Sequence, residues 1–142
     1  ALTPGGHLLI EVPNPDSPAM RIYGPLSPGW MVPQHQHLLP ADNLVAALTE
    51  RGFTIENLEF GDTHMGGDGM YAWWALAQRL APSPGLPWRD DPYPSLARAK
   101  RAATLAALGP LFPLLVAAEA ASKPYLTRGT RANAYRILAR VP

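Results

Sequence analysis

The stretch NAYRILARV, residues 133–141, alternates apolar and polar side chains with a period close to two. Successive side chains of a β-strand point to opposite faces of a sheet, so this pattern predicts a strand with one buried face. We therefore expect residues 133–141 to form the terminal strand of the chain. Its buried face would carry four apolar side chains, namely Tyr135, Ile137, Ala139 and Val141.

A second strand is predicted near the start of the chain. The run HLLIEV, residues 7–12, is almost continuously apolar and follows the turn sequence LTPGG, residues 2–6. Such a strand is typical of a parallel sheet covered on both faces, and Pro13 ends it. We therefore expect residues 7–12 to be buried on both sides.

The middle of the chain adds a helix and a third strand. Residues 41–51 carry an apolar stripe at helical spacing, with Gly52 as the C-terminal cap and Phe53 folding back. Residues 54–60 alternate imperfectly and predict a strand with one wetter face. With the terminal strand, this order predicts an α/β fold.

Residues 13–40 are rich in proline and show no convincing period. Long irregular connections inside compact domains tend to be functional or disordered. This one contains Trp30, Met31, His35 and His37, which a simple linker would not need. We interpret it as a binding loop.

The segment before the terminal strand is predicted to be a helical insertion, over residues 66–130. Residues 70–80 fit a helical period better than an alternating one, with a strand as the alternative because aromatic residues favour sheets. Residues 81–94 form a proline-rich connector. A further helix is expected from Ser95, which would cap it. Pro110 and Pro113 should break or kink that helix before it resumes over residues 114–121.

Composition bounds the class of protein. The 142 residues are 47% hydrophobic and 16% charged, which predicts one globular domain over residues 1–142. No apolar run approaches eighteen residues, and the first residues lack the basic segment of a signal peptide. The absence of cysteine excludes disulfides, thiolate metal sites and a cysteine nucleophile, and a cytoplasmic location is the default expectation.

The net charge of +1 hides an uneven distribution. Residues 1–88 hold three basic and eight acidic residues, whereas residues 89–142 hold nine basic and three acidic ones. A basic second half indicates either solvated helix faces or an anionic partner. The bases are spread over some fifty residues without a nucleic-acid-binding module, so no nucleic-acid partner is expected.

Three segments together resemble class I S-adenosylmethionine-dependent methyltransferases. LTPGG and the strand ending in Pro13-Asn14 look like the fifth strand of that fold and its preceding turn. PQHQHLLP, residues 33–40, resembles a P-x-H-x-H segment that leads into a helix ending in G-F, here Gly52-Phe53. Residues 133–140 look like the last strand, which inserts antiparallel between strands five and six.

The resemblance implies the C-terminal part of a Rossmann-like methyltransferase sheet, with S-adenosylmethionine as the cofactor. In that family the cofactor is held mainly by a glycine-rich loop after the first strand and an acidic residue ending the second, and neither is present here. Residues 66–69, GGDG, also follow a strand, but no suitable acid follows them and a hinge is the favoured interpretation. Cofactor-binding residues therefore stay unknown, and a second chain or a missing N-terminal half would supply them.

His35 and His37 are the candidate catalytic residues. By the resemblance this half builds the acceptor side of the cleft, where an imidazole can take the proton from the attacking nucleophile. Loop packing is the alternative, and a metal site is not expected because no carboxylate or third histidine lies nearby in sequence. Four residues are candidates for substrate binding, with turn geometry or core packing as the alternative: Asn14, Trp30, Met31 and Trp73.

The sequence thus predicts methyl transfer to a small, apolar or aromatic acceptor. The alternative is a non-catalytic helical binding or interaction module that uses no nucleotide cofactor. The segment 95–121 has a basic start and an apolar body, as membrane-surface helices have. A helical lid is favoured over membrane contact for it.

Overall fold

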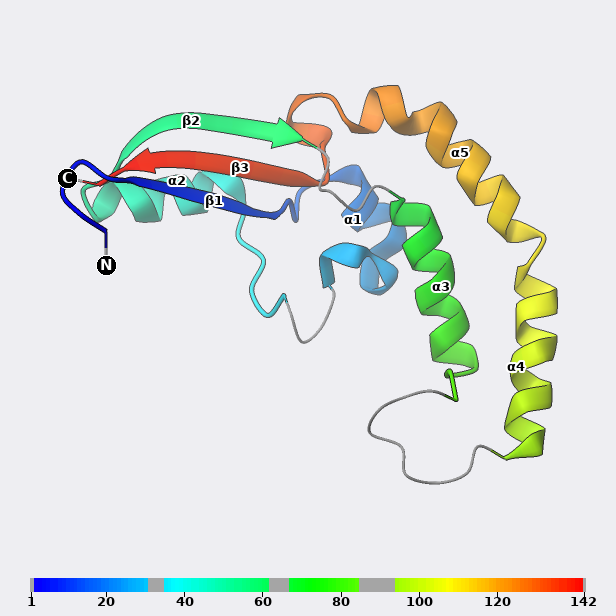
Figure 1. The fold of residues 1–142 in the computed structure, drawn as a ribbon. Helices are drawn as coiled ribbons and strands as arrows, with labels where there is room; N and C mark the ends of the chain where they lie inside the picture. Colours follow the sequence, from blue (N-terminus) through cyan, green and yellow to red (C-terminus); the bar gives the residue numbers. More distant parts are fainter. Residues whose placement is uncertain (1, 31–34, 62–66, 85–93, 142) are drawn as a thin grey trace.

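The computed structural model describes residues 2–30, 35–61, 67–84 and 94–141. Within these ranges the chain forms a three-stranded sheet and five α-helices (Figure 1). The elements in chain order are β1 (His7–Pro13), α1 (Pro18–Tyr23), α2 (Ala41–Glu50), β2 (Thr54–Gly61), α3 (Asp68–Leu80), α4 (Ser95–Leu108), α5 (Leu111–Leu126) and β3 (Ala134–Arg140).

The last strand lies in the middle of the sheet. The strand order is β1-β3-β2, and β3 pairs antiparallel with both neighbours. The strands β1 and β2 therefore run parallel to each other, and Figure 1 shows both ending on the same side of the sheet. The predicted α/β class is confirmed, and so is an antiparallel terminal strand between the two earlier strands.

The core lies between the sheet and α2. On β3 the side chains of Tyr135, Ile137 and Ala139 are almost completely buried, as the alternating pattern predicts. They pack against Ala41 and Leu48 of α2. The predicted turn after this helix is confirmed: α2 ends at Glu50, Arg51 holds the C-cap, and Gly52 follows with a φ of 86°, in the left-handed region.

The expectation that β1 is buried on both faces is wrong. Its side chains alternate between exposed and half-buried, and Leu9 is 61% exposed. The strand lies at the edge of the sheet, and only the α2 side of the sheet is covered in the described chain. A nearly continuous apolar run does not by itself report which faces of a strand receive a neighbour.

The segment between β1 and α2 contains more regular structure than its proline content predicts. Helix α1 begins after Ser17, whose hydroxyl accepts a hydrogen bond from the Met20 amide at 3.3 Å, and Pro18 occupies the first turn. Two short 3-10 turns follow, Gly24–Leu26 and Pro28–Trp30. Proline at the start of a helix is compatible with helical geometry, so it does not exclude such short elements.

Helices α3, α4 and α5 form an arm beside the sheet, and α3 packs against both of the others (Figure 1). The predicted break near Pro110 is confirmed between α4 and α5. The predicted cap at Ser95 is wrong, because Pro94 holds the capping position and no side chain caps this helix. Contacts with α3 stabilise the start of α4 instead, since the Arg101 guanidinium donates to Gln78 and to the Ala81 carbonyl.

Candidate functional site

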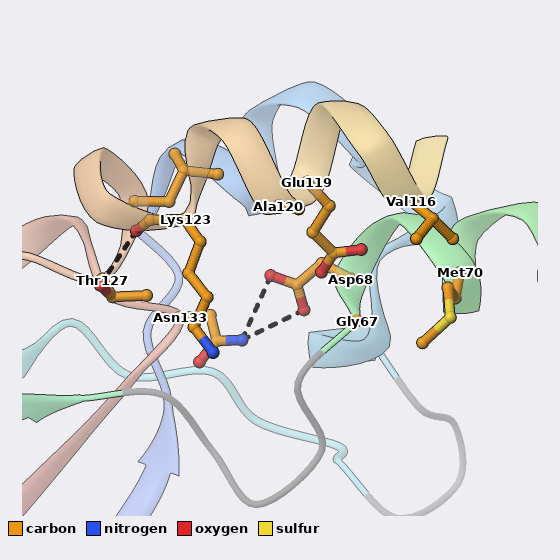
Figure 2. Close-up of a pocket in the computed structure, with 10 residues that line it drawn as sticks. Gly67, Asp68, Met70, Val116, Glu119, Ala120, Lys123, Thr127 and Asn133 are labelled. Carbon is orange, nitrogen blue, oxygen red and sulfur yellow. Dashed lines mark hydrogen bonds between the residues drawn. The ribbon is translucent and has the colours of Figure 1, made fainter. Parts of the chain in front are cut away.

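A cavity of about 260 Å³ lies between α3, α5 and the chain that enters β3 (Figure 2). Asn133 on its wall directly precedes Ala134, and Ala134 pairs with Pro13 and with Gly61, the last residues of β1 and β2. The cavity therefore lies beyond the carboxyl ends of the two parallel strands. In open α/β sheets this is the side on which ligands bind. The lining residues are Gly67, Asp68, Met70, Val116, Glu119, Ala120, Lys123, Leu126, Thr127 and Asn133.

Asp68 is placed in the cavity by the start of α3. Gly67 has a φ of 111°, a conformation that favours glycine, and this turn puts Asp68 in the first turn of the helix. The helix dipole stabilises a carboxylate there. The Asn133 amide donates to both carboxylate oxygens of Asp68, at 3.1 and 3.2 Å, so a side chain from the start of β3 fixes the carboxylate.

Glu119 of α5 and Tyr23 of α1 approach the same turn of α3 from two sides. Gly69 is buried, and a Cβ added there would lie 2.9 Å from the Tyr23 hydroxyl and 3.2 Å from Glu119 Oε2. Burial raises the pKa of Tyr23 above its ordinary value, and the negative charges of Glu119 and Asp68 raise it further. Tyr23 therefore stays a neutral phenol beside two carboxylates.

The cavity has one polar and one apolar wall. Asp68, Glu119, Lys123 and Asn133 form the polar side of the space in Figure 2, and Met70 and Val116 lie at the other end. Carboxylates accept hydrogen bonds from a hydroxyl or an amine, and a positioned carboxylate can remove a proton from such a group. The arrangement suits a small molecule with an apolar body and one hydroxyl or amino group.

Gly69→Ala should destabilise the protein, because the new methyl group would overlap the Tyr23 hydroxyl and press on Glu119. Overpacking outweighs the gain in helix propensity, and we expect a net loss of about 1–2 kcal/mol in the free energy of unfolding. Chemical denaturation measures it. Gly61→Ala is the matched control, since a Cβ there meets nothing within 4 Å. Equal stability of both variants would contradict this packing of α1, α3 and α5.

Stability should fall as the pH rises above 10.0, the ordinary pKa of tyrosine. The pKa of folded Tyr23 is raised by burial first, and that of Tyr135 by burial and by Asp16. As the pH rises, the unfolded chain therefore releases these protons before the folded protein does. The contribution of the two tyrosines to the free energy of unfolding is complete below pH 10.0. It is lost as the pH rises through the raised pKa values of the folded protein. Tyr23→Phe should show a shallower decline in unfolding free energy. An unchanged slope in this variant would contradict the burial of Tyr23.

Asn14, predicted to contact the substrate, is used within the protein. Its side chain is 1% exposed, and its amide donates to the carbonyls of Thr130 and Ala132, both at 2.9 Å. Its Oδ1 accepts from the amide of Asp16 at 3.1 Å. Both amide hydrogens are therefore occupied, and the residue ties the end of β1 to the turn before β3.

The two predicted catalytic histidines do not line the cavity. His35 is half-buried, and its Nδ1 lies 3.1 Å from the Gly29 carbonyl. A carbonyl only accepts, so Nδ1 carries a proton and donates it to this hydrogen bond. His37 is exposed. Among the described residues no group of three His, Asp or Glu side chains could hold a metal ion.

The predicted aromatic lining is divided between separate places. Trp30 ends a 3-10 turn and is 45% exposed, and Met31 lies outside the described residues. Trp73 of α3 faces α4 and α5. Its indole donates to the Leu108 carbonyl at 2.8 Å, and its ring packs edge-on against Phe112 at 5.2 Å. Trp30 and Trp73 thus do not line the cavity described above.

The sequence analysis missed the residues that line the cavity. Asp68 belongs to the GGDG segment, residues 66–69, that we interpreted as a hinge. The structure describes residues 67–69 of this segment. Glu119 stands out in the sequence, since it is the one acidic residue in residues 94–142. The only other charged residue of α5 is Lys123, which lines the same cavity.

Comparison with known proteins gives no relative for this chain. A scan against protein-family models, a search of curated proteins and a search of solved structures each found no match.

Proposed function

We propose that this chain forms the acceptor side of a methyltransferase, which transfers a methyl group from S-adenosylmethionine to a small apolar or aromatic molecule bearing a hydroxyl or amino group. The acceptor occupies the cavity between α3, α5 and the start of β3. Its polar group lies at the carboxylates of Asp68 and Glu119, and its apolar body lies against Met70 and Val116.

The observation that supports this proposal most strongly is the position of the cavity in the sheet. A last strand that runs antiparallel between two parallel strands is the arrangement that the sequence resemblance implies. The cavity lies beyond the carboxyl ends of those parallel strands, where α/β sheets bind their ligands. The proposal therefore rests on topology and on a cavity, which are independent features of the structure.

Glu119 is the residue proposed to accept the proton. Methyl transfer to oxygen or nitrogen requires a nucleophile whose proton leaves as the new bond forms. Glu119 lines the cavity from α5, whereas Asp68 is already fixed by the Asn133 amide. Asp68 and Asn133 then orient the acceptor, and Glu119 removes its proton.

The residues of this chain do not fit the cofactor itself. A cavity of about 260 Å³ is below the range of roughly 300–1,000 Å³ that encloses drug-sized ligands. The glycine-rich loop and the acidic residue that hold the cofactor in the family that the sequence resembles are both absent from the sequence. We therefore propose that a different polypeptide segment holds S-adenosylmethionine, and the role of this chain is restricted to the acceptor.

Calorimetry and NMR test the two parts of the proposal separately. Titration of the 142-residue chain with S-adenosylhomocysteine should release no binding heat. Titration with 4-methylphenol should shift the backbone amides of Asp68, Glu119 and Asn133 in a ¹⁵N spectrum. Binding of S-adenosylhomocysteine by the chain alone would overturn the assignment of the cofactor, and 4-methylphenol shifts confined to other residues would overturn that of the acceptor.

The alternative, a helical interaction module without a nucleotide cofactor, is favoured by one observation. Neither α4 nor α5 contains a buried residue in the described chain. Such helices offer more surface than an acceptor lid requires. An interaction module predicts that neither S-adenosylhomocysteine nor a small phenol binds.

A further inference from the structure

The outer surface of α4 and α5 is apolar and uncovered. Leu114 is 66% exposed, and three other large apolar side chains of the two helices are also exposed: Leu96, Leu111 and Tyr125. The other apolar residues of α4 and α5 are mainly alanine. Helix α4 carries Arg98, Lys100 and Arg101, whereas α5 is apolar over most of its length. Large exposed apolar patches mark sites of interaction with proteins or membranes, so this surface indicates a partner.

The charges of the same segment indicate what that partner is. Residues 94–131 contain six basic residues and one acidic residue, in a chain whose net charge is +1, so the rest of the chain is net negative. The acidic residue, Glu119, faces the cavity. Arg98 and Lys100 near the start of α4 and Arg128 after α5 are exposed. An apolar surface flanked by cations is complementary to an anionic lipid bilayer.

The bend of the helix pair places its leucines and its arginines at different depths relative to a membrane surface. No single described helix is long and apolar enough to cross a membrane, whereas α4 and α5 together have the length and composition, with a 44° bend. Figure 1 shows α3 on the inner side of the bend. Leu111 and Leu114 lie just after the bend, while Arg98 and Arg128 lie toward the two ends of the arm. The leucines can enter the acyl region while the arginines stay at the phosphates.

We propose that α4 and α5 dock on an anionic membrane surface, with Leu111 and Leu114 inserted. A second copy of the chain is disfavoured as the partner, because two net-positive surfaces would repel each other. A nucleic acid is disfavoured because protein surfaces that bind DNA are polar, whereas the exposed leucines at the centre of this surface are apolar. The proposal does not depend on the methyltransferase assignment.

Vesicle co-sedimentation of the full chain tests the docking. The chain should bind vesicles of phosphatidylcholine and phosphatidylglycerol, and bind pure phosphatidylcholine less. Leu114→Glu should weaken binding about tenfold or more. Ile22→Glu on α1 is the matched control, because Ile22 is 68% exposed and lies off the arm. Arg98→Glu should weaken binding to the anionic vesicles about fivefold or more.

Fluorescence quenching by brominated lipids tests the insertion itself. Leu114→Trp should be quenched more strongly than Ile22→Trp, and circular dichroism should show both variants folded. Equal quenching, or equal vesicle binding by Leu114→Glu and the parent chain, would overturn the proposal. No binding to anionic vesicles, together with dimerisation that Leu114→Glu abolishes in sedimentation velocity, would overturn it in favour of a second copy.

Discussion

Asn14→Ala is expected to lower the free energy of unfolding by about 3 kcal/mol. The variant leaves the carbonyls of Thr130 and Ala132 without the donors that reach them at 2.9 Å in the native protein. A buried polar group that loses its partner costs about 1–3 kcal/mol, and two carbonyls are affected here. The turn before β3 also carries Asn133, so the loss should loosen the wall of the cavity as well.

Urea denaturation followed by circular dichroism measures this effect. Asn43→Ala on the exposed surface of α2 is the matched control and should change stability by about 0.5 kcal/mol or less. The measurement separates two roles for Asn14, one in the scaffold and one on the substrate. A loss of ligand binding in Asn14→Ala with a stability change below about 1 kcal/mol would contradict the scaffold role.

Glu119→Gln is expected to lower the turnover number of methyl transfer by about 100–10,000-fold, the range for removal of a general base. Glutamine keeps the shape of the side chain and one acceptor oxygen, so the Michaelis constant for the acceptor should change little. Formation of S-adenosylhomocysteine gives the rate. The protein must be assayed together with the segment that binds the cofactor.

Glu50→Gln is the control for the loss of a negative charge, since Glu50 is exposed at the end of α2. A rate unchanged in Glu119→Gln would exclude this carboxylate as the base. A rise in the Michaelis constant alone would place Glu119 in acceptor binding and not in proton removal.

The elements predicted best from the sequence are those whose pattern is local. The period of two in β3 directly reports Tyr135 and Ile137 as buried, because each strand residue alternates between faces. The double burial predicted for β1 failed on Leu9, because exposure there depends on the sheet order and on whether a second layer is present. Neither is encoded in the run itself.

The candidate site could not be predicted in the same way, because separate segments assemble it. Asp68 and Asn133 are 65 residues apart in sequence and meet only because the helical connection between β2 and β3 brings them together. Glu119 joins them from α5, and no spacing rule connects it with either residue. The histidine spacing that suggested a catalytic pair was a local signal, and the structure uses His35 to contact the Gly29 carbonyl.

Transfer of a tritium-labelled methyl group from S-adenosylmethionine tests the central claim most directly. The protein is expressed from the complete reading frame that encodes these residues and is incubated with 4-methylphenol and related small phenols and amines. The account predicts label in an apolar product that organic solvent extracts, with transfer largely lost in Glu119→Gln and retained in Glu50→Gln. No transfer to any of these acceptors, or equal transfer by the Glu119→Gln variant, would contradict it.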